Sequence, residues 1–109
     1  MWAQMIKVRV KQGKEDDVRK ALEQLLSAEQ RDSGLLQQML MRDQKDPAAF
    51  YLLAVFESEE KARAREADPR RKEATGAMNS VLREALASPP EFMDFDVVQR
   101  HEGQGSISQ

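Results

Sequence analysis

The chain alternates between segments with the apolar spacing of strands and segments with the apolar spacing of helices. The first segment shows the strand pattern, because Trp2, Ile6 and Val8 fall on one face while Lys7 and Arg9 point the other way. The same reasoning predicts strands at residues 2–11, 35–42, 50–57 and 92–99. Helical spacing is predicted between the first two strands and between the last two.

The segment around Phe50 is apolar on both of its predicted faces. One face carries Phe50, Leu52, Ala54 and Phe56, and the other carries Tyr51, Leu53 and Val55. In so short a chain, helices are expected to cover only one face of an antiparallel sheet. The second apolar face therefore needs another cover, and the simplest candidate is a second copy of the chain.

Both helical regions have recognisable starts. The first begins with acidic residues 15–17, which favour a helix N-terminus, and is expected to run to about Arg31. Its apolar stripe consists of Val18, Ala21, Leu22, Leu25 and Leu26. The second starts at Ser58 and is interrupted at Asp68-Pro69, where Asp is suited to cap and Pro to begin a new helix. That helix is predicted to bury Met78, Val81, Leu82 and Leu86.

The order strand-helix-strand-strand-helix-strand predicts an α+β fold of the ferredoxin-like βαββαβ type. We expect an antiparallel sheet with its helices on one face, and two subunits that pair their sheets into a dimeric α/β barrel. Residues 1–100 form the single predicted domain, and residues 101–109 form a polar, flexible C-terminal tail.

Composition narrows the possible functions. The net charge of −2, with 33% charged residues of both signs, gives no field that favours nucleic acid or a membrane surface. The chain has no cysteine and one histidine, His101, so neither a thiolate nor a multi-histidine metal site is expected. The N-terminus lacks the pattern of a signal peptide, and no apolar run approaches a membrane span. We expect a cytoplasmic protein without a cofactor.

Several local patterns together resemble the antibiotic biosynthesis monooxygenase family. They are the stretches 10–13, 33–34, 55–60, 68–69 and 95–98, which read VKQG, SG, VFESEE, DP and FDVV. The resemblance covers residues 2–99 and implies a homodimer with a cleft between each sheet and its own helices. Members of this family bind small aromatic polyketides, quinols or haem there. Several oxygenate their substrate without flavin or metal, because a deprotonated phenol can itself give an electron to dioxygen.

The chain departs from the family at chemically important positions. The haem-degrading branch has Asn, Trp and the iron-ligating His where this sequence has Ile6, Arg65 and Ala74, which argues against haem cleavage. The quinol-oxidising branch has Trp where this chain has Phe56, and commonly His where it has Arg70. Phe keeps the bulk of Trp but lacks the indole donor, and Arg does not serve as a base near neutral pH.

The resemblance assigns a catalytic role to Arg70, as a group that stabilises a phenolate. It assigns the ligand-binding cleft to Trp2, Gln4, Ile6, Tyr51, Phe56, Arg65 and Ala74. Trp2 would either wall the cleft or plug the barrel end, and Tyr51 would either donate to a ligand or lie in the dimer interface. The basic residues at 63, 65 and 70–72 form either an anion clamp or a solvated helix face balanced by acids.

Two functions of different classes remain. The first is a cofactor-independent monooxygenase that acts on a small aromatic or quinol-like compound. The alternative is a catalytically silent homodimer that binds a small apolar ligand or has a structural role. Its motivation is the apolar character of Ile6, Phe56 and Ala74, where chemistry would be expected.

Overall fold

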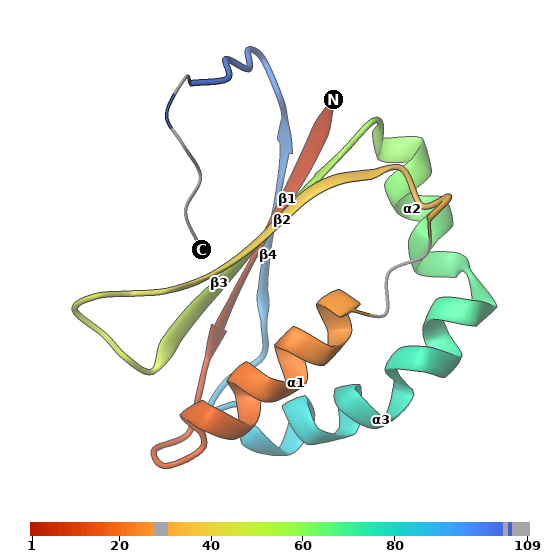
Figure 1. Cartoon of the computed structure of the whole chain (residues 1–109). Coiled ribbons are helices and arrows are strands. Elements are labelled where there is room, and N and C mark those ends of the chain that lie inside the picture. Colours follow the sequence, from red (N-terminus) through yellow and green to blue (C-terminus); the bar gives the residue numbers. More distant parts are fainter. Residues whose placement is uncertain (28–30, 104, 106–109) are drawn as a thin grey trace.

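Four strands form one antiparallel sheet in the order β2-β3-β1-β4 in the computed structural model, which describes residues 1–27, 31–103 and 105. The elements are β1 (Trp2–Arg9), α1 (Glu15–Ser27), β2 (Leu35–Arg42), β3 (Ala49–Phe56), α2 (Glu59–Ala67), α3 (Pro69–Ala85) and β4 (Glu91–Asp96). The helices lie on one side of the sheet (Figure 1). The predicted ferredoxin-like α+β fold is confirmed.

The element boundaries agree with the sequence prediction to within three residues wherever the structure describes them. β2 has the predicted bounds, whereas β1 ends two residues early and β4 ends at Asp96 instead of residue 99. Backbone pairing explains the end of β1, because Lys11 N donates to Ala85 O at 2.9 Å and Ala87 N donates to Arg9 O at 2.8 Å. The chain therefore leaves the sheet to pair with the end of α3. The first helix was predicted to run to about Arg31; α1 is described as far as Ser27, residues 28–30 lie outside the described residues, and Arg31 lies in a turn.

The predicted caps of the second helical region are both present. The Ser58 hydroxyl accepts a hydrogen bond from Lys61 N at 3.1 Å, which satisfies a free donor in the first turn of α2. Asp68 ends α2 and begins α3, where its carboxylate accepts from Arg70 N at 2.9 Å and Pro69 occupies the first turn. One aspartate thus fixes the bend between α2 and α3.

Gly34 holds the entrance to β2 against the start of α2. Its φ of +79° lies in the left-handed region, where residues with a Cβ are strained. A Cβ at this position would lie 2.7 Å from the Cδ of Lys61. The Gly34 carbonyl accepts from Glu57 N at 2.9 Å, which ties the start of β2 to the end of β3.

Two separate apolar clusters hold the helices on the sheet. The first contains Val8, Val10, Val18, Leu22, Phe50 and Ala85, with Leu25, Leu82 and Leu86 packed against it. The second contains Trp2, Ala54, Phe56 and Ala62. The predicted burial of Val81 is wrong, because this side chain is 42% exposed one position before the half-buried Leu82. The side chain of Met78 lies outside the described part of the chain.

The face of the sheet away from the helices is also apolar. Strand register aligns Met39, Leu53, Met5 and Met93 in one row across all four strands. Met39 is 41% exposed, and Phe95 in the neighbouring row is 46% exposed. We call this surface the open face. Its presence agrees with the two-faced pattern of β3, and the predicted homodimer stays a prediction.

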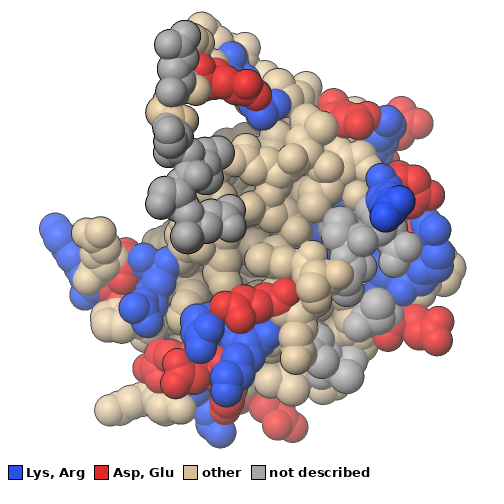
Figure 2. All heavy atoms as spheres, in the orientation of Figure 1, with Lys and Arg blue, Asp and Glu red and all other residues tan. Residues whose placement is uncertain are grey.

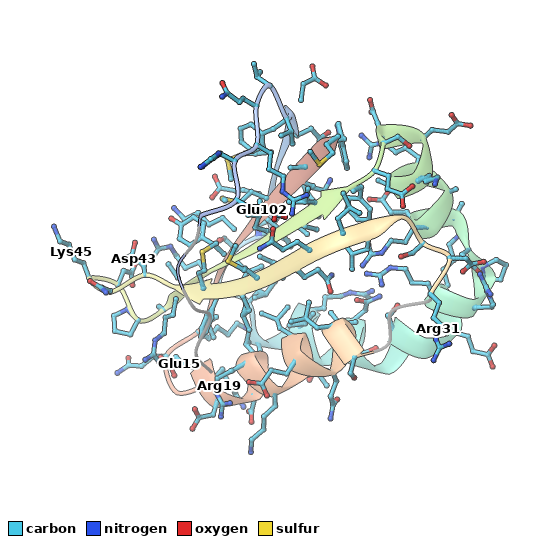
Figure 3. All side chains as sticks on the ribbon, turned by 45° about the horizontal axis from the view of Figure 1, so that its top comes forward. Glu15, Arg19, Arg31, Asp43, Lys45 and Glu102 are labelled. Atoms are coloured by element: carbon cyan, nitrogen blue, oxygen red, sulfur yellow. The ribbon has the colours of Figure 1, made fainter. Side chains whose placement is uncertain are left out.

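Charged side chains lie mainly outside the open face. Figure 2 shows blue and red side chains interspersed toward the edges of the view, with no large region of one sign. Asp43 and Lys45 lie at the tip of the β2–β3 turn, at the opposite end of the molecule from Arg31 (Figure 3). There the Asp43 carboxylate accepts from Lys45 N at 2.8 Å, which stabilises the turn.

Candidate functional site: a cavity between the sheet and the helices

A cavity of about 400 Å³ lies between the sheet and the helices. Its lining includes Val8, Leu22 and Phe50 of the first core cluster and Ala54 of the second. The cavity therefore occupies the space between the two clusters, where the helices do not pack fully onto the sheet. Its volume lies in the usual range for small-molecule sites.

Two rows of side chains across the sheet form the floor of the cavity. In one row Ala54 stands between Gln38 on β2 and Gln4 on β1. In the adjacent row Leu52 is paired with Ile6, which is paired in turn with Phe92 on β4. The small Ala54 side chain leaves space between two amides, so the floor combines an apolar row with one that has hydrogen-bonding groups.

The wall opposite the floor is apolar along most of its length. It contains Leu22, Leu25 and Leu26 of α1 together with Leu82 of α3 and Leu86, which caps α3. Pro90, in the segment before β4, adds to this wall. Burial of an apolar ligand against this wall would stabilise the complex in proportion to the apolar area that leaves water.

Polar and charged groups enter the cavity from α2 and α3. Arg65 and Glu66 come from α2, and Arg71, Asn79 and Arg83 come from α3. Nitrogen-tipped side chains are visible between the sheet and α3 in Figure 3. The guanidinium carbon of Arg65 lies 5.1 Å from the ring centroid of Phe56, so the buried ring supports the arginine through a cation–π contact.

A charged network links Gln4 on the cavity floor to β4 and α2. Gln4 Nε2 donates to Asp94 Oδ1 at 3.0 Å, and Arg63 Nη2 donates to Asp94 Oδ2 at 3.2 Å. The Arg63 guanidinium also lies over the Trp2 ring, at 5.0 Å from its centroid. Desolvation opposes the charge on Arg63, but hydrogen bonds to Glu59 and Asp94 outweigh it and raise its pKa. This network orients the Gln4 amide on the cavity floor.

A smaller, polar hollow of about 180 Å³ adjoins the cavity and shares Arg65 and Arg71 with it. Arg70 lines this hollow, where its Nη2 lies 2.6 Å from Asp68 Oδ2 and 3.1 Å from Asp32 Oδ1. The hydrogen bonds from Arg70 lower the pKa of Asp68, and the same contacts raise the pKa of Arg70. Arg70 therefore serves as a cation between two carboxylates.

The structure brings only some of the predicted site residues to the cavity. Gln4, Ile6 and Arg65 line it. Trp2 and Phe56 are buried behind its end, with ring centroids 6.0 Å apart, so Trp2 plugs this end of the sheet. The three other predicted residues have different surroundings.

Tyr51 points to the open face, where Lys7 Nζ lies 5.7 Å from its ring centroid, because alternation along β3 directs Phe50 and Leu52 to the cavity instead. Arg70 lies in the polar hollow, one helical position before the cavity-lining Arg71. Ala74 belongs to α3, but its side chain lies outside the described part of the chain. Tyr51 and Arg70 are thus not among the residues that line the cavity, and the catalytic role of Arg70 stays a prediction.

Sequence reasoning missed Gln38, Asn79 and Arg83 as cavity residues, and it named Arg71 only as a member of the basic patch at 63, 65 and 70–72. A helical signal for Arg71 and Asn79 is present, because positions 71, 75, 79, 82 and 86 recur at intervals of three or four. Thr75 in this series is 5% exposed, which marks the same inward line. Counting back from Leu82 along this line would have selected Arg71 instead of Arg70.

Few groups in the described part of the chain are suited to acid–base or metal chemistry. Among the described residues, no group of three or more His, Cys, Asp or Glu is placed to hold a metal ion. His101 is exposed beyond β4, and among the described residues that line the cavity Glu66 is the one carboxylate. Within the same residues, no helix has the length and apolarity needed to cross a membrane. The cavity can bind and orient a ligand, with amides and arginines as its polar groups.

Comparison with sequence families identifies the chain. The family described as antibiotic biosynthesis monooxygenase matches residues 1–77, which include β1 to α2 and the first half of α3. The chain belongs to the antibiotic biosynthesis monooxygenase family. This agrees with the resemblance noted from local patterns. No match was found among curated proteins.

Solved structures of antibiotic biosynthesis monooxygenase proteins have the same fold. A protein of Nitrosomonas europaea named for this family has a TM-score of 0.78 at 15% identity, over 91% of this chain and 100% of the other. One from Chloroflexus aurantiacus has a TM-score of 0.71 at 23% identity, over 93% and 96%. A variant of SnoaB, a cofactor-independent oxygenase from Streptomyces nogalater, has a TM-score of 0.75 at 16% identity, over 91% and 94%. At these identities the likeness concerns the fold.

Proposed function

We propose that this family member is a cofactor-independent monooxygenase that acts on a small aromatic or quinol-like compound. The observation that carries the proposal is the open apolar cavity of about 400 Å³ between sheet and helices. A family member whose cleft was filled by side chains would have no place for a substrate. The fold-level likeness to SnoaB, a cofactor-independent oxygenase, supports the same activity.

The proposed oxygenation requires little from the protein beyond binding and orienting the substrate. In an anthrone-like phenol, a methylene carbon loses a proton, and the resulting carbanion transfers electrons to dioxygen and forms a carbon–oxygen bond. When the O–O bond breaks, one oxygen remains as a carbonyl and the other leaves as water with the two methylene hydrogens. One CH₂ and one O₂ thus give one C=O and one H₂O, and the substrate supplies all the electrons.

The residues that line the cavity are suited to binding and orienting a substrate that supplies its own electrons. The apolar walls would exclude water from the substrate anion, and the amides of Gln4 and Gln38 would orient its oxygen substituents. Arg65 would stabilise the negative charge that develops on the substrate. Contact between Arg70 and the substrate would require it to leave Asp32 and Asp68.

Oxygen consumption measured with a panel of quinols and anthrone-like phenols tests the proposal. We expect saturable, protein-dependent turnover with at least one compound, and product carbonyl equal to oxygen consumed. Turnover no faster than the buffer rate across the panel would contradict the proposed activity and favour a silent ligand-binding protein. Hemin serves as a negative probe, because we expect no saturable Soret shift.

We also propose that the protein is a homodimer that pairs its open faces. The row in which exposed Met39 and Met93 flank half-buried Leu53 and Met5 supports this arrangement, since contiguous exposed apolar surface marks interaction sites. Light scattering at micromolar concentration should give about twice the chain mass of 12.4 kDa. A mass equal to one chain would contradict the dimer.

A further inference from the structure

The side chain of Gln4, on the cavity floor, is held by a neighbour on β4. Its Nε2 donates to Asp94 Oδ1 at 3.0 Å, and the two residues stand opposite each other in the register of β1 and β4. The second oxygen of the same carboxylate, Oδ2, accepts from Arg63 Nη2 of α2 at 3.2 Å. Both oxygens of Asp94 are therefore engaged, one by an amide and one by a guanidinium group.

This arrangement decides which end of the Gln4 amide points toward β4. A carboxylate accepts hydrogen bonds and has no proton to donate, so only the N–H end of the amide can bind it. In the reversed orientation two oxygen atoms would face each other without a proton between them. Arg63 holds the carboxylate from the other side through a charge-assisted hydrogen bond, which is the stronger kind. The orientation of the Gln4 amide is thus fixed by Asp94.

The oxygen end of the Gln4 amide lies away from β4. β1 runs between β4 and β3, and Ala54 stands opposite Gln4 on β3. Because the nitrogen and oxygen of an amide diverge from one carbon, an Nε2 held toward β4 leaves Oε1 on the side of Ala54. Within the described residues Oε1 accepts no hydrogen bond, and the small side chain of Ala54 leaves space beside it. The Gln4 carbonyl is therefore an acceptor that a ligand can reach.

The amide on the other side of Ala54 has no comparable support. Gln38 stands opposite Ala54 on β2 and also lines the cavity. In the part of the chain that the structure describes, its side chain makes no hydrogen bond, so the amide can turn and present either its oxygen or its N–H groups. Neighbouring strands are about 4.8 Å apart, so β1 and β2 place the two amides about 10 Å apart, with room for an aromatic ring between them.

We propose that Asp94 is a positioning residue that makes the Gln4 carbonyl the acceptor for a hydroxyl group of the ligand, so that the cavity selects hydroxylated aromatic compounds over their methyl ethers. A ligand that covers this carbonyl without supplying a donor removes the oxygen from water unpaired, which is costly. A methoxy group has no donor, whereas a phenolic hydroxyl donates to Oε1. The site is the cavity of the proposed monooxygenase, so the proposal rests on that function for its substrate class, but it concerns binding and needs no turnover.

Binding of 2-naphthol and of its methyl ether, 2-methoxynaphthalene, tests the proposal at neutral pH. Isothermal titration calorimetry, with the protein titrated into dilute ligand, measures both affinities. We expect naphthol to bind about fivefold tighter than the ether, as for one hydrogen bond. Equal affinities, tighter binding of the ether or no binding of either compound would overturn the proposal.

Two variants on β4 separate the orientation of Gln4 from general effects of charge. In Asp94→Asn, Arg63 still requires an oxygen, so the asparagine turns its NH₂ group toward Gln4. The Gln4 amide then reverses and presents N–H groups to the cavity, and the fivefold preference for the hydroxyl should disappear. Asp96→Asn is the matched control, because Asp96 lies two residues further along the same strand and does not line the cavity. It makes the same change in charge and should keep the preference.

A double variant shows whether Asp94 acts through Gln4. Gln4→Met keeps the length of the side chain but removes the amide, so it should abolish the preference by itself. Adding Asp94→Asn should then change the preference no further, because the two residues act as one unit. A further change in the double variant would overturn the positioning role of Asp94. Gln38→Met should keep the preference even where it weakens binding of both compounds, and its loss there would assign the acceptor to the wrong amide.

The outcomes also separate the proposal from the proposed activity. A hydroxyl preference that depends on Gln4 and Asp94, without oxygen consumption by any phenol, would contradict the monooxygenase and leave the positioning role intact. Turnover of phenols with equal affinities for naphthol and its ether would contradict the positioning role alone. Asp94→Ala, which leaves no polar side chain opposite Gln4, is the second variant if Asp94→Asn does not fold. It frees the Gln4 amide to turn and should also remove most of the preference; an unchanged preference would overturn the proposal.

Discussion

The two faces of one sheet have similar apolar content and different shapes. Toward the helices, Leu52 and Ile6 form part of the floor of a cavity to which the helices contribute arginines and one amide. On the open face, Leu53 and Met5 belong to a row that no helix of the described chain covers. Alternation along β3 divides its side chains between these surfaces. A concave surface with a few polar groups suits a small molecule, whereas a broad apolar one suits a second protein surface.

The largest expected effect comes from the second core cluster, which contains Trp2 and Phe56. Phe56 is 2% exposed and contacts Trp2, so Phe56→Ala should lower the free energy of unfolding by about 3–5 kcal/mol. Urea unfolding followed by circular dichroism measures this. The matched control is Phe92→Ala at the cavity edge, where the ring is 61% exposed and the expected loss is below about 1 kcal/mol. Equal losses would contradict the burial of Phe56 in the core.

The open face is tested next, by placing a charge in its central row. Leu53→Glu puts a carboxylate between Met5 and Met39, where a partner sheet would have to bury it. We expect the dimer to weaken at least about a hundredfold, because an unpaired charge buried in an interface is costly. Light scattering over a concentration series measures the dissociation. Val81→Glu, on α3 at a side chain that is 42% exposed, is the control and should remain dimeric.

The same comparison shows what the sequence contains and what it lacks. The two apolar faces of β3, the caps at Ser58 and Asp68 and the inward line of α1 follow from spacing that spans only a few residues. The rows across the sheet depend on strand register, which local spacing does not specify, so the pairing of Gln38, Ala54 and Gln4 was not predicted. Arg70 and Arg71 differ by one helical position, about 100° around the axis, and only the packing of α3 selects Arg71.

The cavity itself is tested by filling it. Leu82→Phe adds volume to the wall formed by α3, and we expect turnover to fall about tenfold through lost space for the substrate. The adjacent Val81→Phe adds more volume, but at an exposed position that does not line the cavity. Oxygen consumption by Val81→Phe should equal that of the wild type. Unchanged turnover in Leu82→Phe would mean that the substrate uses another site.

The smallest effect is expected at the junction of α2 and α3. Asp68→Asn keeps a capping side chain but removes the carboxylate that pairs with Arg70. Arg70 holds the pKa of Asp68 below its ordinary value of 3.8, so its ionic contribution is fully present above that value and is lost as pH falls through the lower folded pKa. The wild type should therefore melt a few degrees above Asp68→Asn at pH 6, and the gap should close below pH 3.8. Thermal melts at a series of pH values measure it.

A second variant separates the charge of Asp68 from its cap. Asp68→Ala removes both, so it should melt below Asp68→Asn at every pH, and the gap between these two variants should not change between pH 3 and 6. Both variants change the start of α3, which carries Arg71, and neither touches the open face. The dimer mass should therefore stay constant in both variants. A change in dimer mass instead would mean that the two faces of the sheet are not independent.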